Sequence, residues 1–286
     1  MDLFFEKGVQ VVRKALLATL AILAIAATPA LAGPAINLPS NTFLDFNGDG
    51  SFQQFPTGTF DPITGLPNPP DPGDQVAAIA NIHTIAPVGD EGNPVWLPAD
   101  VGPNFEMTES FWGATVDTTS TFYDGVRYYY INVIYTDTGH LALVSDVTKD
   151  YSNAADPGTF DNATGDYATV YTLPAGGAPV DAGESLYLSL DLSDMSSSLK
   201  FDTLKGKFVN GEFHADTVKV TGGYGAAQFY SSLGDADALI IHFSATGWTF
   251  GGDTDLRLHT VPEPATWISL CTGLALLGTY GLRKRM

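Results

Sequence analysis

The strongest constraint on the fold is a two-residue alternation of apolar and polar side chains that recurs along the middle of the chain. Segments such as Gln75–Ala86 and Glu184–Leu192 are short, and Gly, Asn and Asp residues separate them. The strongest short turn signal is Asn210-Gly211, which predicts a hairpin over Leu204–Phe213. Only Ser231–Asp237 suggests a turn of helix. This pattern predicts an all-β fold, namely an antiparallel β-sandwich with a jelly-roll-like arrangement.

The first 32 residues have the features of a signal peptide. Basic residues precede an uncharged apolar run over residues 15–27, which is too short to span a bilayer comfortably. The small residues Ala30 and Ala32 then form an A-x-A cleavage site. We therefore expect signal peptidase to remove residues 1–32, so that the mature chain begins at Gly33.

The last 26 residues, 261–286, carry a second sorting device. An acidic residue between two prolines comes first, an uncharged apolar run over residues 265–282 follows, and basic residues end the segment. The residues that define it are Pro262, Glu263, Pro264, Arg283, Lys284 and Arg285. At about 1.5 Å per residue, the apolar run predicts a single transmembrane helix of about 27 Å. The positive-inside rule places the basic end in the cytoplasm.

This tail resembles the PEP-CTERM signal of Gram-negative bacteria, which exosortases recognise. The resemblance implies a protein that crosses the inner membrane, is held there transiently by its tail, and is then delivered to the cell surface or the extracellular space. It also implies a role in the exopolysaccharide or biofilm matrix, with exosortase and signal peptidase as processing partners. A plain membrane anchor that no enzyme cuts is the alternative for this segment.

Between the two signals lies an acidic ectodomain, residues 33–260, which includes a Pro/Gly-rich loop over residues 56–74. Residues 33–262 contain 29 acidic and 7 basic side chains, a formal net charge of −22. Such a surface repels phosphate backbones, so we expect no nucleic-acid partner. The single cysteine, Cys271, lies in the apolar run of the tail. The ectodomain therefore has neither a disulfide nor a cysteine metal site.

One segment of the ectodomain is similar to the first two-thirds of the calcium loop of EF-hands and dockerins. Asp45, Asn47 and Asp49 occupy the first, third and fifth positions, and the Ser51 carbonyl would be the backbone ligand. The bidentate carboxylate of the twelfth position is missing, because Pro56 stands there. No acid stands close downstream, but either of two acid pairs much further along the chain, Asp235-Ala236-Asp237 or Asp253-Thr254-Asp255, could supply the missing oxygens. The alternative is a Gly-Asp turn without a metal, and calcium is the one cofactor that the sequence suggests.

No nucleophile elbow, P-loop or dinucleotide-binding glycine pattern occurs in the chain, so we expect a protein that is not an enzyme. Glu106 and Glu109 are one candidate carboxylate pair for a polysaccharide-active enzyme, which is the alternative. Aromatic side chains could stack on sugar rings: Trp96, Trp112, Trp248, Tyr128, Tyr129 and Tyr130. Because side chains alternate along a strand, Tyr129 is expected to face away from Tyr128 and Tyr130. The expected function is a structural or glycan-contacting matrix module; a calcium-stabilised spacer is a further alternative.

Overall fold

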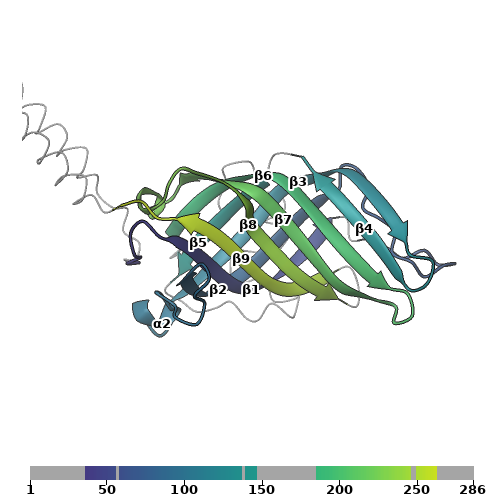
Figure 1. The fold of residues 1–286 in the computed structure, drawn as a ribbon, viewed down its shortest axis with the longest axis horizontal. Helices are drawn as coiled ribbons and strands as arrows, with labels where there is room; N and C mark the ends of the chain where they lie inside the picture. The colour runs from purple at the N-terminus through teal and green to yellow at the C-terminus, as the bar shows by residue number, and fades with distance from the viewer. Residues whose placement is uncertain (1–35, 56–57, 137–138, 147–184, 246–248, 263–286) are drawn as a thin grey trace, which may run out of the picture. The chain divides into compact units, whose positions relative to one another are not determined.

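The computed structural model describes residues 36–55, 58–136, 139–146, 185–245 and 249–262 (Figure 1). Within them lie nine strands: β1 Phe43–Phe55, β2 Gln75–Pro87, β3 Glu106–Tyr123, β4 Tyr128–Tyr135, β5 Gly139–Asp146, β6 Ser185–Asp202, β7 Lys207–Gly222, β8 Ser232–Ala245 and β9 Thr249–His259. A short α-helix, α2, covers Pro98–Val101, and a 3₁₀ turn, η2, covers Ala226–Gln228. No helix among these residues is long and apolar enough to cross a membrane.

All nine strands belong to one antiparallel sheet that closes on itself. The strand order is β2-β1-β9-β8-β7-β6-β4-β3-β5, and a further pairing between β2 and β3 joins the two sides of the sheet. The strands β4 and β5 both lie between β3 and β6, each pairing with a different half of these long strands. Closure leaves few unpaired edges, which favours a stable all-β fold.

The predicted all-β, antiparallel character is confirmed, but the two-sheet sandwich with a jelly-roll-like arrangement is not what the strand pairs show. Every neighbouring pair is hydrogen-bonded within the same sheet. The physical reason is that local turn signals specify which consecutive strands form hairpins. The pairs that close this sheet, such as β1 with β9, join residues about 200 positions apart and carry no local signal.

The hairpin between β6 and β7 turns earlier than the sequence indicated. The turn lies at residues 203–206, where Gly206 adopts a φ of 63° and its N–H donates to the Asp202 carbonyl at 2.8 Å. The predicted turn at Asn210-Gly211 is wrong: both residues lie inside β7, beside a shift in register. The predicted helical turn at Ser231–Asp237 is also wrong, because β8 begins at Ser232.

The inside of the closed sheet is packed with apolar side chains. Phe111 contacts Phe213 with ring centroids 4.9 Å apart, and Tyr135 adds a third ring 5.5 Å from Phe213. The Tyr135 hydroxyl is buried but satisfied, since it lies 2.6 Å from the Ser197 hydroxyl. In β9 such side chains alternate with outward-facing polar residues, since Leu256 is buried and Arg257 is partly exposed, whereas β2 and the first half of β3 are buried on both faces.

The two ends of the sheet differ in what they carry. At one end, the first and last described segments meet: the Thr42 N–H donates to the Thr260 hydroxyl at 2.9 Å, and Asn41 and Val261 share a backbone hydrogen bond. At the other end lie the β3–β4 and β6–β7 turns, which are neighbours because Tyr128 pairs with Asp202. Figure 1 shows both turns away from the point where β9 ends.

Four carboxyl groups are buried among the described residues, those of Asp45, Glu106, Glu109 and Asp202, and Asp45 and Glu109 have raised pKa values. Glu109 is 2 % exposed, and one of its oxygens accepts a hydrogen bond from the Thr254 hydroxyl at 3.0 Å, while the other has no partner. Desolvation raises the pKa of Glu109 to about 7. Asp45, also 2 % exposed, lies 3.7 Å from the Arg257 guanidinium. Burial, reinforced by the charge of Asp255, raises the pKa of Asp45 to about 6.

These raised pKa values predict that the protein loses stability as the pH rises. The folded state holds protons that the unfolded chain releases above about pH 4.5, so the free energy of unfolding falls until Glu109 has ionised near pH 7. The part due to Glu109 is about 3 kcal/mol. Urea unfolding curves between pH 4.5 and 8 measure it. Glu109→Gln should flatten the slope above about pH 6, where Asp45 has already ionised, whereas Asp216→Asn, at an exposed position, should leave it unchanged. An equal slope in both variants would contradict the assignment.

Candidate functional site

The candidate site lies on the outer face of β4, β6 and β7, where aromatic rings are accessible. Tyr128 and Tyr130 both face outward, with ring centroids 6.4 Å apart. The ammonium of Lys200, which pairs with Tyr130 across β4 and β6, lies 4.0 Å from the Tyr128 centroid and 5.7 Å from that of Tyr130. Phe122 of β3, 62 % exposed, extends the aromatic row with its ring 6.1 Å from Tyr130. We call Phe122, Tyr128, Tyr130 and Lys200 the aromatic face.

The predicted alternation of the three tyrosines is confirmed. Tyr129 lies opposite Phe201, whose side chain is buried, and packs against the apolar core. Tyr128 and Tyr130 instead contact Lys200 on the outside. One strand thus uses the same residue type for packing on one face and for a surface platform on the other.

A polar groove borders the aromatic face. It has a volume of about 160 Å³ and is lined by Tyr130 and the following residues of β6 and β7: Ser198, Leu199, Lys200, Asn210, Gly211 and Glu212. The Glu212 carboxylate is held by two histidines, with the His214 ring nitrogen at 3.2 Å and the His242 ring nitrogen at 3.6 Å. A hydroxyl, an amide, an ammonium and a carboxylate therefore line one depression beside an aromatic ring.

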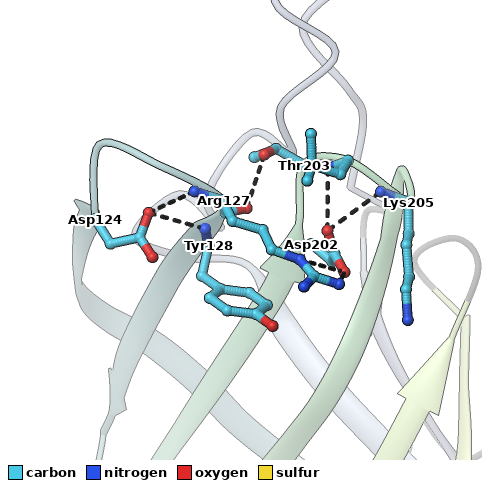
Figure 2. Close-up of polar contacts among 7 residues, drawn as sticks. Asp124, Arg127, Tyr128, Asp202, Thr203 and Lys205 are labelled. Atoms are coloured by element: carbon cyan, nitrogen blue, oxygen red, sulfur yellow. Dashed lines mark hydrogen bonds and ion pairs between the residues drawn. The ribbon is translucent and has the colours of Figure 1, made fainter.

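At the end of the aromatic face lie the β3–β4 and β6–β7 turns. Each is held by one carboxylate that accepts several hydrogen bonds, Asp124 in the first turn and Asp202 in the second (Figure 2). Asp124 accepts the backbone N–H groups of Val126, Arg127 and Tyr128 at 2.7 to 3.0 Å, and these bonds hold its pKa below the usual value. Asp124 thereby fixes the start of β4. Since this bond pattern needs only an Asp at the first turn position, it is a local property of the sequence.

Asp202 ties the second turn to the first. One of its oxygens accepts the N–H groups of Leu204 and Lys205, and the other accepts both Nε and Nη2 of Arg127, at 3.0 and 2.6 Å. The hydrogen bonds from Arg127 lower the pKa of Asp202 to about 2. The Thr203 hydroxyl and N–H both donate to the Arg127 carbonyl. Tyr128 follows Arg127 directly, so this network positions its ring.

The residues of the suggested calcium loop lie in a strand rather than in a turn. Asp45, Asn47, Asp49 and Ser51 all belong to β1, and the side chains of the first three share one face of the strand. Asn47 pairs with Asp255, and Asp49 pairs with Asp253, so β9 does bring the expected acids alongside. Asp49 also contacts a His83 ring nitrogen at 3.0 Å. Among the described residues, no group of three or more His, Cys, Asp or Glu side chains is placed to hold a metal ion. Calcium binding stays a prediction.

The candidate carboxylate pair of β3 is split between the two faces of the sheet. Glu106 and Glu109 are separated by three positions in a stretch without a register shift, so their side chains point to opposite faces. Both side chains are buried. These two carboxyls therefore cannot flank one substrate from this strand.

The tryptophans and the sorting residues complete the predicted set. Trp96 and Trp112 are 3 % and 2 % exposed, so neither offers a surface for a sugar ring. Pro262 is the last described residue. Several predicted positions lie outside the described residues: Ala30, Ala32, Gly33, Trp248, Glu263, Pro264, Arg283, Lys284 and Arg285. Sequence reasoning named the tyrosines but missed Lys200, Asn210 and Glu212, since no motif links β4 to β6 and β7.

Comparisons with known proteins add little to this picture. No protein-family model matches the chain, and no curated protein matches it. Two crystal structures of Ail, the attachment invasion locus protein of Yersinia pestis, align with it at 10 % and 8 % identity. The first, in complex with the heparin analogue sucrose octasulfate, aligns over 77 % of this chain and 98 % of that one, with a TM-score of 0.14. The second aligns over 78 % and 99 %, with a TM-score of 0.12. Scores this low support no functional argument.

The stability of a Gly50 variant can distinguish a plain strand at Asp45–Ser51 from a calcium loop. A Cβ at Gly50 would lie 2.3 Å from the Ile79 carbonyl oxygen of β2, so the glycine is required by close strand packing. Gly50→Ala should lower the free energy of unfolding by about 1–3 kcal/mol, with or without calcium. Urea unfolding measures the loss. Gly92→Ala, where a Cβ meets nothing within 4 Å, is the matched control and should be nearly neutral. A loss at Gly50 seen only with calcium present would instead favour the loop.

Proposed function

We propose that this protein is an exported, non-catalytic component of the cell-surface or exopolysaccharide matrix that contacts glycan through its aromatic face. The observation that carries the proposal is the pair of outward tyrosines, Tyr128 and Tyr130, beside the polar groove of β6 and β7. Sugar rings present both apolar C–H faces and hydroxyl groups, so a glycan site needs flat aromatic rings together with hydrogen-bonding side chains.

The groove supplies the polar half of such a site. Ser198 and Asn210 can each donate and accept hydrogen bonds, Lys200 donates, and Glu212 accepts. Alternating donors and acceptors match vicinal sugar hydroxyls, each of which also donates and accepts. Because the groove is open rather than enclosed in the core, it suits a segment within a long polymer.

The turn network supplies preorganisation. Tyr128 is held between the Asp124 turn and the Arg127–Asp202 ion pair, and Lys200 lies over its ring. A ligand that stacks on a ring already held in place loses less conformational entropy on binding than one that must order the ring. The rigid placement of Tyr128 therefore favours a role in ligand binding over that of a side chain that is exposed by chance.

Export and sorting rest on the two ends of the sequence. The last strand, β9, ends at His259, at the end of the sheet where Thr42 and Thr260 are bonded, while the aromatic face extends toward the opposite end. A tail attached to a membrane or a cell surface at residue 262 would thus leave the aromatic face free to meet the matrix. This arrangement suits a surface-attached protein, whether residues 261–286 act as a PEP-CTERM signal or as a plain anchor. A polysaccharide-active enzyme and a calcium-stabilised spacer are the competing functions.

Removing the rings should abolish glycan retention. Tyr128→Ala with Tyr130→Ala should weaken binding to the host's own exopolysaccharide about tenfold or more, because two stacking contacts are lost. Affinity electrophoresis through gels containing that polymer measures the retardation. Tyr128→Phe with Tyr130→Phe keeps the rings and should retain most of the binding.

The matched control is Tyr230→Ala, at a tyrosine that is 40 % exposed but lies beside His259, where the first and last described segments meet. It should not change the retardation. Equal retardation of the alanine double variant and the parent protein would refute the aromatic face as the site. New reducing ends in the polymer after incubation with the protein would favour the enzyme instead.

The sorting signal predicts a separate outcome in the host. Glu263→Ala should leave the protein in the inner membrane, because the acidic residue of the Pro-Glu-Pro motif would be absent. Fractionation with intact-mass measurement distinguishes the two fates: the delivered form should begin at Gly33. Glu91→Ala, at an exposed loop position, is the control and should be delivered normally. Normal surface delivery of Glu263→Ala would refute sorting through this motif while leaving the glycan site to be tested separately.

A further inference from the structure

The two neighbouring turns that bound the aromatic face expose aliphatic side chains at their tips. Val126 in the β3–β4 turn is 78 % exposed, and Leu204 in the β6–β7 turn is 77 % exposed. A single exposed aliphatic residue is common on protein surfaces. Two on adjacent turns, with Phe122 exposed close by on β3, form an apolar tip that the fold itself does not use.

The tip is held rigidly by the same bonds that position Tyr128. The Val126 N–H donates to Asp124, and the Leu204 N–H donates to Asp202, so the backbone of each turn is fixed next to its aliphatic side chain. The Arg127–Asp202 ion pair then locks one turn to the other (Figure 2). The exposure of Val126 and Leu204 therefore does not come from loose turns that could fold these side chains inward.

Basic side chains gather around this tip, although the whole chain has a formal net charge of −19. Six Lys and Arg residues lie in the described part of the chain, and four of them belong to these two hairpins: Arg127, Lys200, Lys205 and Lys207. The carboxylates of Asp124 and Asp202 are engaged by backbone N–H groups and by Arg127. The loop over residues 58–74 lies at the same end of the sheet, since Phe60 contacts Phe201 and Phe208, and it carries acids rather than basic residues.

We propose that this tip, formed by Val126 and Leu204 with Lys205 and Lys207, docks onto an anionic lipid surface. Aliphatic side chains do not stack on sugar rings, but they insert into the boundary between lipid headgroups and acyl chains. Lysines beside them are attracted to anionic headgroups over about one Debye length. The combination of protruding aliphatic residues and a local basic cluster on an acidic protein matches this surface better than it matches a glycan.

The tip lies at the end of the sheet opposite to Thr260 and Val261. A lipid surface bound there faces away from the point where the chain leaves the sheet toward its C-terminus. The contact is therefore independent of any anchoring through the tail, and it does not require the aromatic face to bind glycan.

An environment-sensitive fluorophore at the tip tests the proposal in the full chain. Cys271→Ser removes the only native cysteine, and Val126→Cys then accepts the probe nitrobenzoxadiazole. The labelled chain is first reconstituted into phosphatidylcholine nanodiscs, so that any tail insertion is already complete. Acceptor vesicles are then added, made either of phosphatidylcholine alone or with about one third phosphatidylglycerol.

We expect a blue shift and a rise in emission only with the phosphatidylglycerol vesicles. The same probe at Val88→Cys, 43 % exposed and bonded to Phe43 at the other end of the sheet, should not respond. Lys205→Gln with Lys207→Gln should raise the lipid concentration needed for half the shift about thirty-fold. Leu204→Asp should abolish the shift of the Val126 probe.

Three results would overturn the proposal. The first is no shift at Val126 with anionic vesicles. The second is an equal shift at Val126 and Val88, which would mean non-specific adsorption. The third is a shift of the Val126 probe with a soluble acidic polysaccharide but not with vesicles, which would make the tip part of a glycan site. The tyrosine variants of the aromatic face should leave the vesicle response unchanged, so the two sites are distinguishable.

Discussion

The structure depends on closure of one antiparallel sheet through two long-range pairings, β1 with β9 and β2 with β3. These pairings give every strand two neighbours and enclose a single apolar interior without disulfides. Closure also forces β1 and β2 so close together that Gly48 and Gly50 have no room for a side chain. The same enclosure buries the Glu109 carboxyl, which is tolerated because it can hold its proton near neutral pH.

Closure also determines what the outer surface can do. Long strands that pair β6 with β4 on one side and with β7 on the other place Tyr130, Lys200 and Asn210 on one outer face, although they come from three different strands. The ion pair between Arg127 and Asp202 then fixes the end of that face. The aromatic face, which we propose as a glycan contact, and the apolar, basic tip both border these two turns. The acids of β1 and β9, by contrast, are paired side by side on another part of the surface.

Much of the secondary structure could be predicted from local pattern. The strand expected at Gln75–Ala86 is β2 with one residue added, and the alternation of Tyr128 to Tyr130 is correct, because a period of two is a property of the extended backbone itself. The β6–β7 turn was misplaced at Asn210-Gly211, since the stronger turn combines Asp202 with Gly206 and gains stability from Arg127, a residue 75 positions from Asp202. The segment that resembles a calcium loop forms part of strand β1 instead of a turn. Its Gly50 is needed because β2 lies too close for a side chain.

The sequence by itself determined the all-β class, the acidic surface, the alternation of the tyrosines and the presence of two candidate sorting segments at the chain ends. Each of these depends on composition or on neighbours within a few residues. Only the tertiary structure decided that the sheet closes on itself, that both Glu106 and Glu109 are buried, and that Lys200 lies over Tyr128. The physical reason is that strand pairing is selected by the shared burial of distant apolar faces, and that selection leaves no mark in any short stretch of sequence.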